Sequence, residues 1–193
     1  MKGKNIIGIA VAEIVYILLF VLAASSGAIH PACYAYVGTF IPLLFAFVYL
    51  YVSANMKCFG SALLLNGILL VAALIAGEGN TALIILLLVL TAAAEVIRFF
   101  VGYGSLKGVR LSFIPFAFSF YAYSAHWWTE TEESLAEALV EMPLGYANKM
   151  AKVIDNVPVL IVMLILTVPV AILAMRLAEK ALKKQAILLE SGK

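Results

Sequence analysis

Charged side chains are scarce in this sequence. Asp, Glu, Lys and Arg make up only 12% of the 193 residues, whereas an ordinary soluble domain carries about 25%. Hydrophobic residues reach 65%, and the mean hydropathy is +1.08. The formal net charge of +2 is too small to favour nucleic acid as a partner. This composition excludes an ordinary soluble domain and indicates a protein whose main surroundings are a lipid bilayer.

Recognisable enzyme motifs are also missing. The sequence contains no His-Glu-x-x-His, no Gly-x-Ser-x-Gly and no phosphate-binding loop, which are the short patterns with the clearest catalytic or nucleotide-binding chemistry. We therefore expect that the chain is not an enzyme. Any active transport would need energy from another subunit.

Long apolar runs dominate the sequence. The hydrocarbon core of a bilayer is about 30 Å thick and requires about 20 apolar helical residues. The first run is longer than the 7–15 apolar residues, roughly, of a signal peptide, so we expect it to be retained. We predict an all-α membrane protein, a single domain over residues 1–193, with six transmembrane helices at about 5–24, 32–53, 58–76, 81–101, 109–126 and 157–178.

Lys and Arg between the runs predict the orientation, because short cytoplasmic flanks are enriched in these residues. On one side of a six-span arrangement lie Lys2, Lys4, Lys57, Lys107, Arg110, Arg176, Lys180, Lys183 and Lys184. The other side receives the loops at 25–31 and 77–80 and the acidic connection 129–156. We predict cytoplasmic termini and an extracellular 129–156 segment, which is either a solvated linker or a lid.

The chain has two cysteines, and the predicted topology separates them. Cys33 is expected near the outer face and Cys58 near the inner face, too far apart for a disulfide bond between them. Both are interpreted as small buried hydrophobic residues.

Three ionisable residues fall well inside predicted spans, away from the span ends, where charge is costly and usually has a partner or a function. Glu13 lies in the first span, and Glu95 and Arg98 are three residues apart in the fourth. They could form a coupling or proton-relay group, or a structural ion pair. Gly8 and Ala12 form a small-residue step that allows another helix to approach closely, either a partner's helix or one of this chain.

Both histidines are expected at the outer face, surrounded by aromatic side chains. Interfacial aromatic residues normally anchor helix ends, and that is one interpretation. The other is a ligand site, because a neutral imidazole can bind a metal or haem iron. The candidate substrate-binding residues are His30, Tyr34, Tyr36, Tyr123, His126, Trp127 and Trp128.

Several of these features occur together in one group of transport proteins. Six helices with both ends inside, a small-residue step in the first helix and an outer lid before the sixth resemble the S component of an energy-coupling-factor (ECF) transporter. The His30-Pro31 start of the second run, the stretch AAAEVIRFFVGYGSLKGVRLSFIPFAFS (92–119) and the basic C-terminal helix resemble the Trep_Strep family. This resemblance implies an S-component-like bundle in the bacterial cytoplasmic membrane.

The resemblance also implies a function. An S component captures a small nutrient in an outward pocket and works with a transmembrane T subunit and two ATPase subunits. S components dock through an Ala-x-x-x-Ala-like surface, to which Gly8 and Ala12 correspond. Nickel and cobalt members carry a His after the first Met, where this chain has Lys2.

Haem is the first expected substrate under this resemblance. His30 and His126 would be its possible iron ligands, and the neighbouring aromatic side chains would stack on the macrocycle. A vitamin or another small hydrophobic nutrient is the second, and no intrinsic cofactor or protein-held metal is expected. The alternative from another class is a non-transport membrane scaffold or an intramembrane enzyme that uses Glu13, Glu95 and Arg98.

Overall fold

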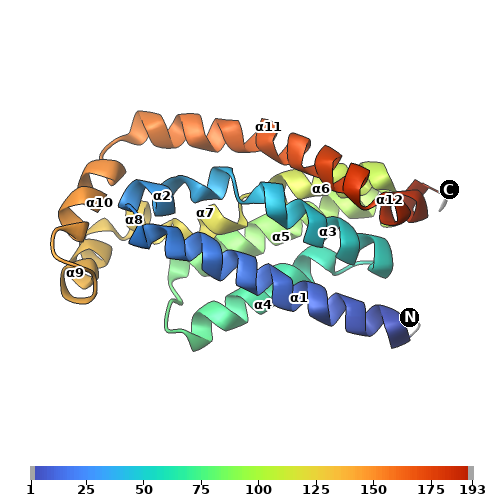
Figure 1. Cartoon of the computed structure of the whole chain (residues 1–193), viewed down its shortest axis with the longest axis horizontal. Helices are drawn as coiled ribbons and strands as arrows, with labels where there is room; N and C mark the ends of the chain where they lie inside the picture. The colour runs from blue at the N-terminus through green and yellow to red at the C-terminus, as the bar shows by residue number, and fades with distance from the viewer. Residues whose placement is uncertain (1–2, 191–193) are drawn as a thin grey trace.

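The computed structural model describes residues 3–190, with side chains from Ile6 to Glu190, as an elongated bundle of helices (Figure 1). The described residues contain helices and no strands, which confirms the predicted all-α class. In chain order the elements are α1 (Gly3–Ala24), η1 (Ser25–Ala28), α2 (Pro31–Tyr36), η2 (Val37–Thr39), α3 (Pro42–Met56), α4 (Ser61–Ile75), α5 (Thr81–Val101), α6 (Leu106–Phe116), α7 (Ser119–Ser124), α8 (His126–Thr129), α9 (Thr131–Glu141), α10 (Tyr146–Ile154), α11 (Val157–Ala181) and α12 (Lys183–Glu190).

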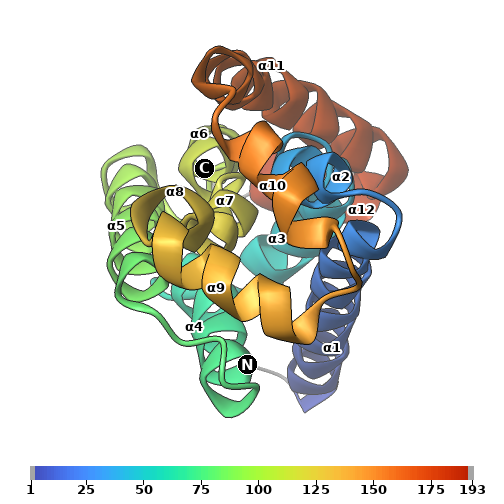
Figure 2. The same cartoon turned by 90° about the vertical axis from the view of Figure 1, so that its left-hand side faces the viewer.

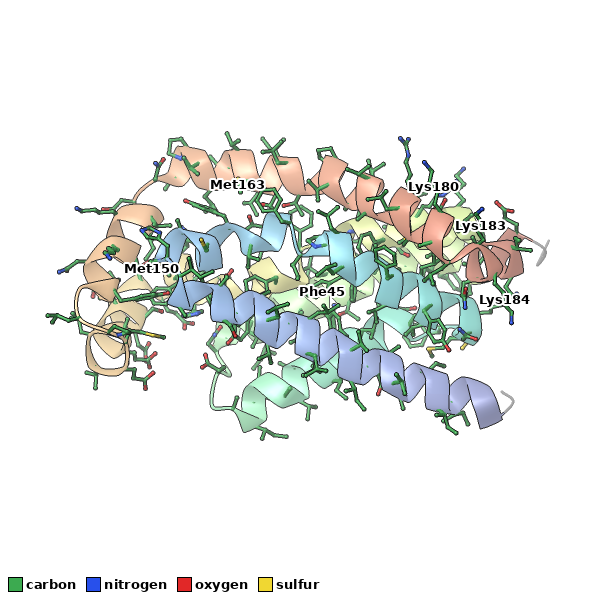
Figure 3. All side chains as sticks on the ribbon, viewed as in Figure 1. Phe45, Met150, Met163, Lys180, Lys183 and Lys184 are labelled. Atoms are coloured by element: carbon green, nitrogen blue, oxygen red, sulfur yellow. The ribbon has the colours of Figure 1, made fainter. Side chains whose placement is uncertain are left out.

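The two ends of the bundle differ in what they contain. Helices α8, α9 and α10 gather at one end, here named the cap end, and α9 and α10 lie across it (Figure 2). The beginning of α1 and helix α12 lie at the opposite, terminal end, together with Lys180, Lys183 and Lys184 (Figure 3). Lys2, used in the topology prediction, lies outside the described residues. Both ends of the described chain therefore share one end of the bundle.

Three helical segments are long and apolar enough to cross a membrane: Ile6–Ala28, Thr81–Val101 and Val157–Ala181. A fourth span results if Pro31–Thr39 and Pro42–Met56, which meet at a bend of 42°, are counted together. Helix α4 has 15 residues, a length of about 22 Å. The chain is thus a membrane protein with three or four candidate spans, and six spans with cytoplasmic termini stay a prediction.

The predicted fifth span, 109–126, is divided among α6, α7 and α8. Pro115 lies inside α6, which ends at the next residue. Proline cannot donate a backbone hydrogen bond and its ring crowds the preceding turn of a helix. Ser119 then donates to the Phe116 carbonyl at 2.6 Å and begins α7. The apolar run is therefore real, but it does not form one continuous helix.

The predicted second span is interrupted between α2 and α3. Gly38 lies in η2, and a Cβ atom there would lie 2.9 Å from the Tyr121 ring. Thr39 Oγ1 lies 2.6 Å from the Tyr121 hydroxyl, so the break contacts α7 directly. Cys33 and Cys58 are both free, in agreement with the prediction that they form no disulfide, but both are exposed, so the prediction that they are buried is wrong.

Aromatic packing and one polar hub hold the middle of the bundle. Phe45 lies between the helices (Figure 3), and its ring is 4.8 Å from that of Tyr16. Asn66 accepts hydrogen bonds from Ser119 at 2.9 Å and from Tyr16 at 3.4 Å, and it donates to Thr91 at 2.9 Å. This side chain links α1, α4, α5 and α7, since a buried polar group must find partners within the protein.

The small-residue step in α1 faces this chain's own α3. A Cβ atom at Gly8 would meet the Tyr51 hydroxyl, and Ala12 is buried in the main core cluster. The step therefore lets α1 approach α3, which is the intrachain alternative for these two residues.

Candidate functional site

A cavity of about 480 Å³ lies at the cap end. Its walls come from the end of α1, from η1 and α2, from the α4–α5 loop and from α7 to α10. These segments are far apart in the sequence and meet only at this end of the bundle. Five of the seven predicted substrate-binding residues line it: His30, Tyr34, Tyr123, His126 and Trp127.

The other two predicted residues support the cap instead of lining the cavity. The Tyr36 hydroxyl donates to the Val153 carbonyl at 3.2 Å and so joins α2 to α10. Trp128 packs, partly buried, against a small second core formed by the cap helices.

Helices α9 and α10 have this small core of their own. Its buried members are Trp127, Ala138, Ala147, Met150 and Ile154, and Met150, labelled in Figure 3, is completely buried. Apolar burial of this kind gives the connection a defined position. The 129–156 segment therefore covers the cavity as two packed helices, an arrangement that a lid requires and a loose linker lacks.

His30 occupies the N-cap of α2. Its Nδ1 accepts a hydrogen bond from the Ala32 backbone N–H at 3.1 Å, and Pro31 is the first residue of the helix. Proline suits that position because its missing N–H is not needed there. A neutral His30 in this geometry carries its proton on Nε2, so neither ring nitrogen has a free lone pair for iron.

His126 has a different arrangement. Its Nδ1 lies 2.8 Å from the Ser134 hydroxyl. That hydroxyl also donates a hydrogen bond to the His126 backbone carbonyl at 3.2 Å. Both contacts are hydrogen bonds when Nδ1–H donates to Ser134, which leaves the lone pair on Nε2. Burial lowers the pKa of His126 to about 4, so the imidazole is neutral at pH 7.

The structure adds three carboxylates that the sequence did not single out for this site: Glu78, Glu137 and Glu141. Glu78 comes from the α4–α5 loop, and the other two lie four residues apart on one face of α9. Burial raises the pKa of Glu78, and Glu141 and Glu137 raise it further. Lys149 is the one Lys or Arg side chain among the described residues that line the cavity. The i, i+4 spacing of Glu137 and Glu141 was the only local sequence signal for this acidic group.

Glu95 and Arg98 contact backbone groups and do not form an ion pair with each other. Glu95 accepts from the Gly60 N–H at 3.0 Å and from the Ala62 N–H at 2.8 Å, where α4 begins. Arg98 is fully buried and its Nη2 donates to the Tyr103 carbonyl at 3.1 Å.

No ion pair joins Glu13 to either of these residues in the described part of the chain, where the one salt bridge is Arg110–Glu179, at 2.6 Å. Glu13 is only partly buried, so the three residues do not form one buried group, and Glu95 serves as a helix cap.

Comparison with known families identifies the chain. The sequence model of a family described as hypothetical bacterial integral membrane protein (Trep_Strep) matches residues 3–187. The chain belongs to the Trep_Strep family. No curated protein and no solved structure matches this Trep_Strep protein. Within residues 3–190, no group of three or more His, Cys, Asp or Glu side chains could hold a metal ion.

Proposed function

We propose that this Trep_Strep protein is the substrate-binding S component of an ECF-type importer and captures a small nutrient at the cap end. The observation that carries the proposal is the cavity of about 480 Å³ beneath α9 and α10. Its size lies within the range of about 300–1,000 Å³ that is typical of small-molecule sites. In this proposal the basic terminal end is cytoplasmic and the cap end faces outward.

Uptake against a gradient requires an energy source, and the sequence has no phosphate-binding loop. The proposed partners are therefore a transmembrane T subunit and two ATPase subunits. Docking at Gly8 and Ala12, which the S-component resemblance implies, would require α1 to move away from Tyr51 of α3.

Haem fits the described side chains less well than a vitamin-like molecule does. Nδ1 of His30 is engaged at the N-cap of α2, so His126 is the one histidine with a ring nitrogen free for iron. The three glutamates would also repel the two carboxylates of haem. The same geometry gives the enzyme alternative little support, because Glu95 is engaged with two backbone N–H groups.

Copurification from native membranes tests the proposal. The tagged chain, extracted in a mild detergent, should capture one transmembrane subunit and two ATPase subunits, which mass spectrometry would identify. A tagged multi-pass protein of unrelated function serves as the control for nonspecific capture. Recovery of the chain without any ATPase would reject the importer role and leave the scaffold and enzyme alternatives.

A further inference from the structure

We infer that the cap-end cavity binds an organic cation: a small ring compound with an ammonium or pyridinium-type charge. This inference rests on the proposed function, because it names the substrate class of the same site. It goes further in that it predicts the sign of the ligand's charge.

The first support is the charge around the cavity. Three carboxylates, from Glu78, Glu137 and Glu141, share its walls with a single ammonium group, that of Lys149. None of the three forms a salt bridge in the described part of the chain, where the one ion pair joins Arg110 of α6 to Glu179 of α11. A cation inside the cavity would be attracted by all three carboxylates and repelled by one group.

The second support is that the fold keeps these acids together although they repel one another. Glu141 and Glu137 each disfavour the charged form of Glu78. Glu78 precedes α5, whereas the other two lie on α9, so tertiary packing and not chain proximity brings them together. Groups that are unfavourable for the free protein are concentrated at functional sites, where a ligand of opposite charge removes the cost.

The third support is an aromatic wall. The Tyr34 ring centroid lies 6.4 Å from that of Trp127 and 6.4 Å from that of Tyr123, and all three residues line the cavity. The face of an aromatic ring attracts a cation, and Trp and Tyr do so most strongly. Carboxylates and ring faces favour the same kind of ligand through independent interactions.

The described residues also favour one kind of cation. An organic cation is favoured over a metal ion, since no metal-binding cluster exists within residues 3–190.

A charge series of nearly equal shape tests the inference on the purified full-length chain. The probes are 1-methylnicotinamide, which is a cation, nicotinamide, which is neutral, and nicotinate, which is an anion. In calorimetric titrations we expect the cation to bind about tenfold more tightly than the neutral probe and the anion to bind most weakly.

Single variants then assign the preference to side chains. Glu78→Gln, Glu137→Gln and Glu141→Gln should each weaken 1-methylnicotinamide binding by roughly three- to tenfold and leave nicotinamide binding unchanged. Lys149→Gln should strengthen binding of the cation, because it removes a repulsion. Glu133 lies on α9 with Glu137 and Glu141 but does not line the cavity. Glu133→Gln is therefore the matched control and should change neither affinity.

The aromatic wall has its own variant. Trp127→Leu removes the ring face, so it should weaken the binding of 1-methylnicotinamide more than that of nicotinamide. Melting temperatures without ligand show whether each variant is folded.

The outcomes separate this inference from the proposed function. Equal affinities for the three probes, preference for nicotinate, or binding of none of them at roughly 10 mM would each overturn the cation inference. Charge preference in a protein that captures no ATPase would reject only the importer role. Capture of the ATPases without charge preference would reject only the ligand class.

Discussion

The cap end and the region around Glu95 and Arg98 use charge in opposite ways. Towards the terminal end, Glu95 accepts two backbone hydrogen bonds and Arg98 donates to a carbonyl. At the cap end, three carboxylates line a cavity whose walls contain one lysine. Nε and Nη1 of the fully buried Arg98 have no hydrogen-bond partner among the described residues, so the contrast holds for the carboxylates. A carboxylate held by backbone N–H groups serves the fold, and one without such partners is available for binding.

The largest expected effect is the labelling of cysteines on the two sides of the membrane, because each site either reacts or does not. Cys33 lies in α2 at the cap end, and Cys58 lies just before α4 at the terminal end; both are exposed. In intact cells a membrane-impermeant maleimide should label Cys33 and not Cys58, with Cys33→Ser and Cys58→Ser as controls. Labelling of both, or of Cys58 alone, would contradict the assignment of the cap end to the outside.

Removal of the Glu95 carboxylate should have the largest effect on stability. In Glu95→Ala the Gly60 and Ala62 N–H groups lose their acceptor, and an unsatisfied buried donor costs about 1–3 kcal/mol. We expect a loss of about 4 kcal/mol in the free energy of unfolding, measured in detergent. Glu95→Gln keeps one acceptor oxygen and should lose about half as much. A stability of Glu95→Ala equal to that of the wild type would refute the helix-cap role.

The cap should loosen separately from the bundle. Met150→Ala opens a cavity in the small core of α9 and α10 and should cost about 2–3 kcal/mol. We expect faster amide hydrogen exchange in α9 and α10 and little change in α3 and α5, because local regions unfold independently. Leu144→Ala, at a fully exposed site of the α9–α10 turn, is the control. Uniform acceleration over the whole chain would show that cap and bundle unfold as one unit.

The smallest expected effect comes from Glu78. Its raised pKa means that the folded protein disfavours the ionised form, so stability falls as pH rises through the folded pKa. Glu78→Gln should therefore raise the melting temperature without ligand by about 1 °C at pH 7. The advantage should shrink as the pH falls, because protonation removes the charge of Glu78 in the wild type. A lower melting temperature for Glu78→Gln at pH 7 would contradict the repulsion among the three acids.

The apolar runs predicted helices well, because a backbone in lipid must satisfy its own polar groups locally. Continuity was harder to predict. The 109–126 run looks like one span by hydropathy, and Pro115 was the signal that it divides. The break at Gly38 depends on the Tyr121 ring, 83 positions further along the chain, and had no local signal.

Part of the cap-end site could also be predicted from the sequence. His30, Tyr34, Tyr123, His126 and Trp127 line one cavity, since polar and aromatic residues at neighbouring ends of apolar runs are expected at one face. Tyr36 and Trp128, in the same segments, point to the cap instead. Side-chain direction depends on the local break of each helix, which hydropathy does not report.

By itself, the sequence determined that this protein is helical, lies in a membrane and carries most of its basic side chains towards one end, because hydrophobicity and charge act on each segment separately. Only the tertiary structure decided that Glu95 caps α4, that Nδ1 of His30 is engaged by the backbone, and that Glu78 meets the acids of α9. Each of these depends on distances between atoms of packed or turning segments. A hydrogen bond or a charge interaction fails when such distances grow by a few ångströms, and no pattern along the chain specifies them.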